Sequence, residues 1–211
     1  MILEAREVGF DYVPGRPVVD GWSATFARGS MTAITGPSGR GKSTLMYVLG
    51  LMLRPSRGDL LVDGMPVSAL RDAARARLRA DRFGFVFQDA SLDATRSVLD
   101  NVTETALYQG RDRRQVAARA AGLLERFGVD VPAGRKPGQV SGGQAQRIAL
   151  CRALLTDPMV LLADEPTGNL DPVTAQLVVA ALRDHAASGS AVIVVTHAPD
   201  VADACDHEIR L

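Results

Sequence analysis

The chain contains few residues of the types that mark a secreted or metal-centred protein. Its 211 residues include two cysteines, three histidines and 5% aromatic residues. Cys151 and Cys205 lie far apart in the sequence and form no C-x-x-C pair. We therefore expect two structural thiols in a reduced, cytoplasmic protein, and neither a disulfide nor a zinc site.

The chain also lacks a net charge and a long apolar run. Basic and acidic side chains balance, so the formal net charge is zero and provides no general attraction to nucleic acid. No apolar run approaches the roughly 18 residues of a spanning helix. The first ten residues alternate like a strand and do not follow the pattern of a signal peptide. The hydrophobic content of 46% is sufficient for the core of one domain.

Short apolar segments alternate with helical patterns along most of the chain, which indicates an α/β fold. We expect strands at residues 2–10, 22–26, 31–35, 59–62, 83–87, 159–163 and 191–196. We expect helices at residues 44–53, 68–81, 97–108, 113–127, 143–155 and 172–187. Short, fully apolar strands separated by helices favour a mainly parallel sheet that is covered on both faces.

A block with helical spacing and charged faces interrupts this pattern and is followed by a Gly/Pro-rich loop at residues 128–139. We predict a single domain over residues 1–211. Its α/β core takes residues 1–88, with an antiparallel β part at the N-terminus, together with residues 156–211. Residues 89–155 form an inserted α-helical lobe.

The segment GPSGRGKST, residues 36–44, lies between an apolar strand and an apolar-periodic helix. It matches the G-x-x-x-x-G-K-[ST] pattern in the strand–loop–helix context that the pattern requires. Its glycines let backbone N–H groups turn toward phosphate oxygens, and the helix N-terminus adds a positive dipole end. A glycine-rich turn without a ligand is the alternative. The predicted phosphate-contacting residues are Gly36, Pro37, Ser38, Gly39, Arg40, Gly41, Lys42, Ser43 and Thr44.

Within this loop, two side chains have distinct predicted roles. Lys42 should reach the β- and γ-phosphates, and the Ser43 hydroxyl should bind Mg²⁺.

Two adjacent carboxylates end the apolar segment VLLADEP, residues 160–166. Ligands of parallel sheets bind at the carboxyl ends of the strands. We therefore predict that Asp164 holds Mg²⁺ and that Glu165 activates the attacking water as general base. An ordinary acidic junction between a strand and a turn is the alternative, which the phosphate loop disfavours.

Gln88 and His197 each follow another short apolar segment. Because parallel strands align their carboxyl ends, His197 is expected near the γ-phosphate, and Gln88 is expected to orient water and contact Mg²⁺. Taken singly, each is more often an ordinary polar residue at a strand end.

The segment VSGGQAQR, residues 140–147, precedes an apolar helical run and has no metal ligand or nucleophile nearby. Considered within one chain, it is an ordinary capped helix start.

Taken together, these residues resemble the ATP-binding subunit of an ABC transporter, over essentially the whole chain. The family's motifs occur in order: the phosphate loop, Gln88, the signature at residues 140–144, Asp164 with Glu165, residues 169–171 and His197. The resemblance implies a P-loop NTPase core that hydrolyses ATP. It also implies that Tyr12 stacks on adenine, although packing of its ring on the sheet is the alternative.

The resemblance further implies that two nucleotide-binding subunits pair head to tail around ATP. Ser141, Gly142, Gly143 and Gln144 of one copy would face the γ-phosphate held by the other, and Asp171 would couple the two sites. The implied cofactors are ATP and Mg²⁺. The implied partners are an integral membrane permease and a second nucleotide-binding subunit, without nucleic acid, at the cytoplasmic face of the cell membrane.

More narrowly, residues 84–88 and 164–171 resemble the branch that serves macrolide exporters, lipoprotein-releasing complexes and the cell-division ATPase. This branch implies export or force transmission. Val140 stands where Leu is usual. Residues 89–102, which should contact the membrane subunit, also depart from the branch's usual sequence.

Two other classes of function compete with this one. The first is an ABC-type ATPase of DNA repair, chromosome organisation or translation, whose members usually carry coiled-coil insertions, zinc modules or two cassettes. The second is a force-transmitting regulator of cell division. The Arg-rich residues 71–82 are open to interpretation as a membrane or nucleic-acid surface, but the balanced charge favours a solvated helix face.

Overall fold

The computed structural model describes residues 1–211, with nine strands in two sheets and seven α-helices. The strands are β1 (Leu3–Val13), β2 (Arg16–Phe26), β3 (Ser30–Thr35), β4 (Arg57–Val62), β5 (Met65–Pro66), β6 (Phe83–Val86), β7 (Val160–Asp164), β8 (Ala191–Val195) and β9 (His207–Arg210). The helices are α1 (Lys42–Leu49), α2 (Asp72–Arg82), α3 (Val98–Tyr108), α4 (Arg113–Arg126), α5 (Gly142–Leu154), α6 (Pro172–Ala187) and α7 (Pro199–Asp203), with a 3₁₀ helix η1 (Pro137–Gln139).

The N-terminal sheet has four antiparallel strands in the order β2-β1-β4-β5. Asp63 and Gly64 form the turn between β4 and β5, with φ angles of 48° and 77°. Positive φ at both positions is what a two-residue hairpin turn needs, and Asp-Gly supplies it. The predicted antiparallel part at the N-terminus is confirmed.

The second sheet has five parallel strands in the order β6-β7-β8-β3-β9. Successive side chains along its strands point alternately into two cores. In β8, Ala191, Ile193 and Val195 belong to the core that contains α1 and the antiparallel sheet. Val192 and Val194 point to the other core, which contains α6 and the helical lobe. The sheet is therefore covered on both faces, as its apolar strands predict.

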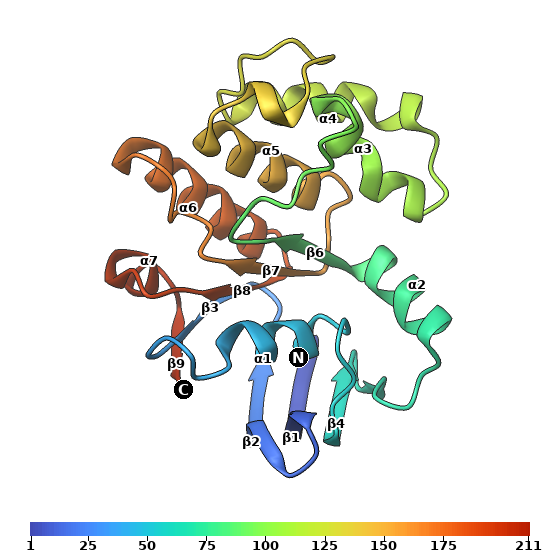
Figure 1. Ribbon diagram of the computed structural model, residues 1–211, viewed down its shortest axis with the longest axis vertical. Coiled ribbons are helices and arrows are strands. Elements are labelled where there is room, and N and C mark those ends of the chain that lie inside the picture. Colours follow the sequence, from blue (N-terminus) through green and yellow to red (C-terminus); the bar gives the residue numbers. More distant parts are fainter.

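Helices α3, α4 and α5 gather at one end of the molecule, beyond the parallel sheet (Figure 1), and form the helical lobe. Its apolar side chains do not form a separate core. Val98 and Ile148 of the lobe lie in the same buried cluster as Leu161 and Ala163 of β7. The lobe is thus packed directly against β6 and β7, at one side of the parallel sheet.

Two helices differ from the predicted ranges by more than one residue: α1 covers residues 42–49 instead of 44–53, and α2 covers residues 72–82 instead of 68–81. The helix expected at residues 44–53 begins at Lys42, because Gly41 takes a left-handed conformation with φ 85° and caps it. The helix expected at residues 68–81 begins at Asp72. Ser68 instead accepts a hydrogen bond from the Leu60 backbone N–H at 2.7 Å, which ties it to β4.

The region after residue 196 is more ordered than expected. No strand or helix was predicted beyond residue 196, but α7 and β9 form there, and β9 pairs in parallel with β3. No helix of the chain is both long and apolar enough to cross a membrane.

Candidate active site

The register of the parallel sheet brings the predicted site residues to one edge. Ile34 of β3 pairs with Val195 of β8, and Val195 pairs with Asp164 of β7. Val86 of β6 pairs with Ala163 of β7. Each strand is followed within two residues by a polar element: the phosphate loop, His197, Glu165 and Gln88.

These elements line a cavity of about 410 Å³, here called the phosphate cavity. Its lining residues are Val18, Ser38, Gly39, Gly41, Lys42, Ser43, Thr44, Gln88, Asp164, Glu165, Val195 and His197. Ten of these were named from the sequence. Gly36, Pro37 and Arg40 of the loop do not line the cavity.

The phosphate loop curls around the Lys42 side chain. The Lys42 ammonium donates to the carbonyl oxygens of Gly36 at 2.6 Å and Pro37 at 2.9 Å. A Cβ at Gly41 would lie 2.8 Å from Val18 Cγ1, so the close approach of β2 requires glycine there. Helix α1 has no side-chain cap and no acidic residue in its first turn. Its first N–H groups are therefore free to bind an anion.

Glu165 is held in one orientation at the edge of the cavity. Its residue is buried and left-handed, with φ 46°. The Thr196 hydroxyl donates to Glu165 Oε2 at 3.1 Å, and His197 Nδ1 lies 2.6 Å from Glu165 Oε1. The His197 side chain itself is 75% exposed. A fixed carboxylate beside an accessible imidazole is suited to orienting and deprotonating a water molecule.

Asp164 is the more deeply buried of the two carboxylates of the cavity, with 5% of its surface exposed against 9% for Glu165. Burial raises its pKa above the ordinary value, the neighbouring charge of Glu165 acts in the same direction, and the Ser43 hydroxyl and Lys42 oppose the shift. A cation in the cavity would favour the ionised carboxylate.

The oxygen donors around Asp164 suit Mg²⁺. Ser43, Asp164 and Gln88 offer a hydroxyl, a carboxylate and an amide oxygen, which are hard ligands of the kind that Mg²⁺ prefers. No group of three or more His, Cys, Asp or Glu side chains could hold a metal alone. The donor set therefore fits an ion that shares its coordination with phosphate and water.

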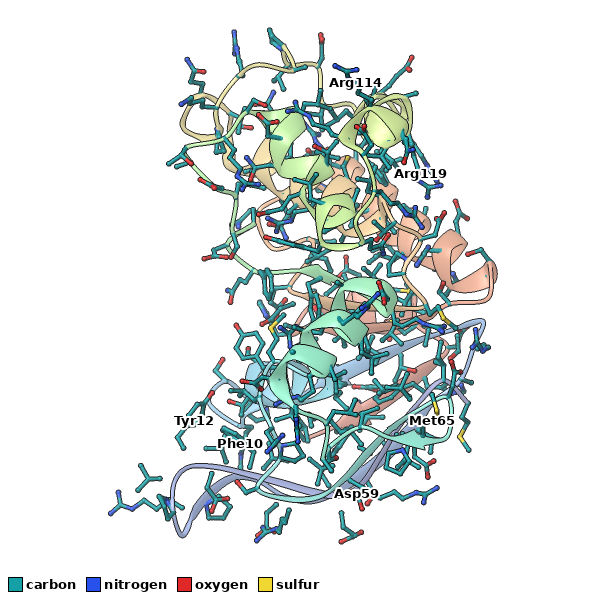
Figure 2. The ribbon with its side chains drawn as sticks, turned by 90° about the vertical axis from the view of Figure 1, so that its right-hand side faces the viewer. Phe10, Tyr12, Asp59, Met65, Arg114 and Arg119 are labelled. Atoms are coloured by element: carbon teal, nitrogen blue, oxygen red, sulfur yellow. The ribbon has the colours of Figure 1, made fainter.

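Tyr12 lies beside the phosphate loop but does not line the cavity. Its hydroxyl is 3.3 Å from Thr44 Oγ1, and its ring meets the Phe10 ring edge to face with centroids 4.8 Å apart. Figure 2 shows both rings close together at one side of the antiparallel part. Tyr12 is 61% exposed, so much of its ring is free to stack on a ligand.

The signature segment, residues 140–144, lies on the helical lobe and does not line the phosphate cavity. Ser141 caps α5: its hydroxyl accepts from the Gln144 N–H at 3.2 Å, and the Gln144 side chain accepts from the Ser141 N–H at 2.9 Å. Ser141 and Gly142 are exposed. One chain alone therefore provides a capped, solvent-facing helix start and nothing for it to bind.

Asp171 caps α6 next to the signature segment. Its carboxylate accepts from the Thr174 N–H at 3.0 Å and from the Thr174 hydroxyl at 2.6 Å. Arg147 of α5 donates to the same hydroxyl at 3.4 Å. Gly143 faces Leu170, since a Cβ there would lie 3.5 Å from the Leu170 side chain. The loop that carries Asp171 is thus joined to the signature helix.

Sequence reasoning did not name Thr196 or Val18 as site residues. Thr196 is a polar residue at the end of an apolar strand, directly before His197, so the pattern that indicates His197 could have indicated it too. Val18 carries no such signal, because only the packing of β2 against Gly41 brings it to the cavity.

The comparison with protein families agrees with this geometry. The family described as "ABC transporter" matches residues 19–168. The lipoprotein-releasing system ATP-binding protein LolD of Bordetella avium (strain 197N) is 44% identical over 204 residues, which cover 96% of this chain and 89% of that protein. The macrolide export ATP-binding/permease protein MacB of Rhodospirillum rubrum is 45% identical over 199 residues, which cover 94% of this chain and 30% of that protein.

Solved structures share the fold along the whole chain. A bacterial ABC transporter cassette solved as a dimer superposes with a TM-score of 0.92 and 30% identity, covering 100% of this chain and 94% of that chain. An ATP-binding cassette solved as a dimer in a post-hydrolysis state with ADP and Pi gives a TM-score of 0.90 at the same identity and coverage.

Proposed function

The chain belongs to the ABC transporter family as an ATP-hydrolysing subunit, and we propose that two copies close around ATP to drive a separate membrane permease. The observation that carries this proposal is the phosphate cavity, where the loop of Lys42 and the fixed carboxylate of Glu165 meet. The subunit works at the cytoplasmic face of the membrane, where ATP is present.

The reaction converts ATP and water to ADP and phosphate. The N–H groups at the start of α1 and the Lys42 ammonium bind the phosphates and stabilise the charge that develops on them. Glu165 accepts the proton of the attacking water, while Thr196 and His197 keep its carboxylate in place. Mg²⁺, held by Ser43, Asp164 and Gln88, would neutralise phosphate charge.

The second copy supplies what one chain lacks. The signature segment is exposed and remote from the phosphate cavity of its own chain. In a head-to-tail pair, the start of α5 with Ser141 faces the γ-phosphate in the partner's cavity, where a helix dipole stabilises negative charge. Asp171, which is joined to α5 through Thr174 and Arg147, then lies at the same interface.

A groove of about 890 Å³ between α2, β6 and α3 is the surface for the permease. Phe85 and Phe87 of the β6 segment stack with centroids 5.9 Å apart and line it. Leu107 and Tyr108 on α3 are 48% and 66% exposed at its rim. An exposed apolar groove with charged neighbours is suited to binding a short segment of a partner.

The names of two relatives bear on the direction of transport. One similar protein is named for lipoprotein release and another for macrolide export. We therefore favour export or force transmission for the complex that this subunit serves, with the permease selecting the substrate.

Light scattering on Glu165→Gln, with and without ATP and Mg²⁺, tests the proposed pairing. Without its base the variant should bind ATP without hydrolysing it, so a monomer should become a dimer only when ATP and Mg²⁺ are present. Lys42→Ala is the control, because it loses the phosphate contacts and should stay monomeric. A Glu165→Gln chain that binds ATP but remains monomeric at all concentrations would contradict pairing by this chain alone.

A further inference from the structure

We propose that Arg152 is a positioning residue that holds Gln88 in place at the phosphate cavity and links it to the groove. This inference rests on the proposed role of Gln88 in hydrolysis. Arg152 lies on α5, lines the groove and donates to the loop that follows Gln88.

The loop after Gln88 has an unusual backbone. Ala90 and Ser91 are consecutive non-glycine residues in the left-handed region, with φ angles of 62° and 44°. Each such residue costs about 1 kcal/mol or more and persists only where the surroundings impose it. A loop of this kind relaxes when the contacts that impose it are removed.

Arg152 supplies those contacts. Its guanidinium donates to the Ser91 carbonyl at 2.7 Å and to the Ala90 carbonyl at 2.8 Å. A second residue of α5, the buried Gln146, donates to the Phe87 carbonyl at 3.1 Å. Carbonyls on both sides of Gln88 are thus bound to one helix.

Arg152 carries a buried positive charge that packing alone does not explain. The residue is 8% exposed, and its guanidinium donates to the Ala90 and Ser91 carbonyls and not to a carboxylate. Burial lowers its pKa, while Glu104, Tyr108 and Asp89 act in the opposite direction at longer range. A buried guanidinium without a close carboxylate is costly. A planar donor that spans two carbonyls explains its presence, because an apolar side chain would pack there without holding the loop.

The same helix also fixes the strand that leads to Gln88. A Cβ at Gly84 of β6 would lie 2.7 Å from the Ala153 carbonyl oxygen, so β6 and α5 touch through their backbones. Helix α5 begins at the signature segment and passes along β6 (Figure 1). Helix α5 therefore contacts both the strand before Gln88 and, through Arg152, the loop after it.

The test compares Arg152→Lys and Arg152→Met with wild type in ATP turnover by the purified chain. Lysine keeps the charge but cannot donate through two parallel N–H groups, so it should fold and still lose activity. We expect kcat to fall by on the order of tenfold to a hundredfold, as for a misplaced catalytic group, with KM for ATP changed less than about twofold. Hydrogen exchange of residues 88–92 should rise, and that of residues 36–44 should not.

Arg75→Met is the matched control. Arg75 is 5% exposed and donates to the carbonyl of Leu51, another left-handed residue with φ 59°, but it touches neither Gln88 nor the phosphate cavity. It should lower thermal stability as Arg152→Met does, and kcat should stay near the wild-type value.

Combination with Gln88→Ala decides whether Arg152 acts through Gln88. In the Gln88→Ala chain, Arg152→Lys should reduce kcat no further. Additive losses would overturn the proposal, and so would wild-type turnover of Arg152→Lys or of Gln88→Ala. The dimerisation of Glu165→Gln is independent of these outcomes, so failure of the proposed pairing and failure of this inference are distinguishable.

Discussion

The phosphate cavity and the signature segment are both built at helix starts, but only the first is enclosed by its own chain. Helix α1 begins after Gly41, has no side-chain cap and opens into a cavity with Lys42 and Glu165. Helix α5 begins after Ser141 with a complete capping box, and its start faces solvent.

The two helix starts differ in whether their own chain provides the rest of a binding site. Free N–H groups at the start of α1 are stabilised when phosphate binds, so the chain alone forms a binding site. At α5, Ser141 already satisfies the Gln144 N–H. In the proposed pair, the remaining N–H groups and the helix dipole would act on the ligand that the second copy brings.

The largest expected effect is in the phosphate cavity. Lys42→Ala removes the ammonium that is held by the Gly36 and Pro37 carbonyls and that should neutralise phosphate charge. We expect ATP turnover to fall by on the order of 10³-fold or more. A coupled assay of phosphate release and titration with a fluorescent nucleotide measure turnover and binding separately. Turnover within tenfold of wild type would contradict the assigned role of Lys42.

A smaller loss is expected at the signature segment. Ser141→Ala should reduce turnover by on the order of 10²-fold, because a group that faces the γ-phosphate across the pair is lost. Nucleotide affinity of the monomer should not change, since Ser141 does not line the phosphate cavity. This outcome would separate the two regions functionally.

Ser97→Ala is the control for the loss of a cap. Ser97 forms the same kind of capping box at α3, with its hydroxyl accepting from the Asp100 N–H at 3.1 Å. Both variants should lose about 1 kcal/mol of stability in chemical denaturation. If Ser97→Ala lowered turnover as much as Ser141→Ala, the effect at Ser141 would be structural and the cross-subunit role would be wrong.

Asp164→Asn should raise the stability of the fold and abolish ATP turnover. Burial raises the pKa of Asp164, so the fold disfavours its charged form, and a neutral amide removes that cost. Without nucleotide and in the presence of a chelator, we expect a gain of about 1 kcal/mol, or a rise of about 2–4 °C in Tm. Mg²⁺-dependent turnover should be lost. A lower Tm in differential scanning calorimetry would contradict the cost assigned to the buried charge.

The smallest expected effect lies outside both regions. Burial lowers the pKa of His185, whose Nε2 lies 2.9 Å from the Pro158 carbonyl oxygen. The unfolded chain takes up a proton near pH 6.5 and the folded chain does so only at lower pH. This contribution to stability is therefore complete above pH 6.5 and is lost as the pH falls below it.

Denaturation of wild type and His185→Gln at pH 7.5 and pH 5.5 measures this contribution. The wild type should lose more stability on acidification than the variant, by less than about 1 kcal/mol. An equal or smaller loss in the wild type would show that His185 is not the responsible group.

The strands and the phosphate site could be predicted because their signals are local. Apolar runs such as residues 191–195 have no helical period, and the glycine pattern before Lys42 has few structural alternatives. The start of α2 could not be predicted, since Ser68 is drawn to β4 by a contact across the fold. Strand β9 could not be predicted either, because it pairs only with β3, which lies far away in the sequence.

Residue type and short-range spacing are sufficient to predict the α/β class, the phosphate loop and the polar residues at the strand ends. Other features became visible only in the folded chain. Thr196 and His197 bind Glu165. Val18 lies against Gly41, and Arg152 donates to the loop after Gln88. These contacts join segments far apart in the chain, and their geometry depends on strand order, register and helix packing, which no local pattern encodes.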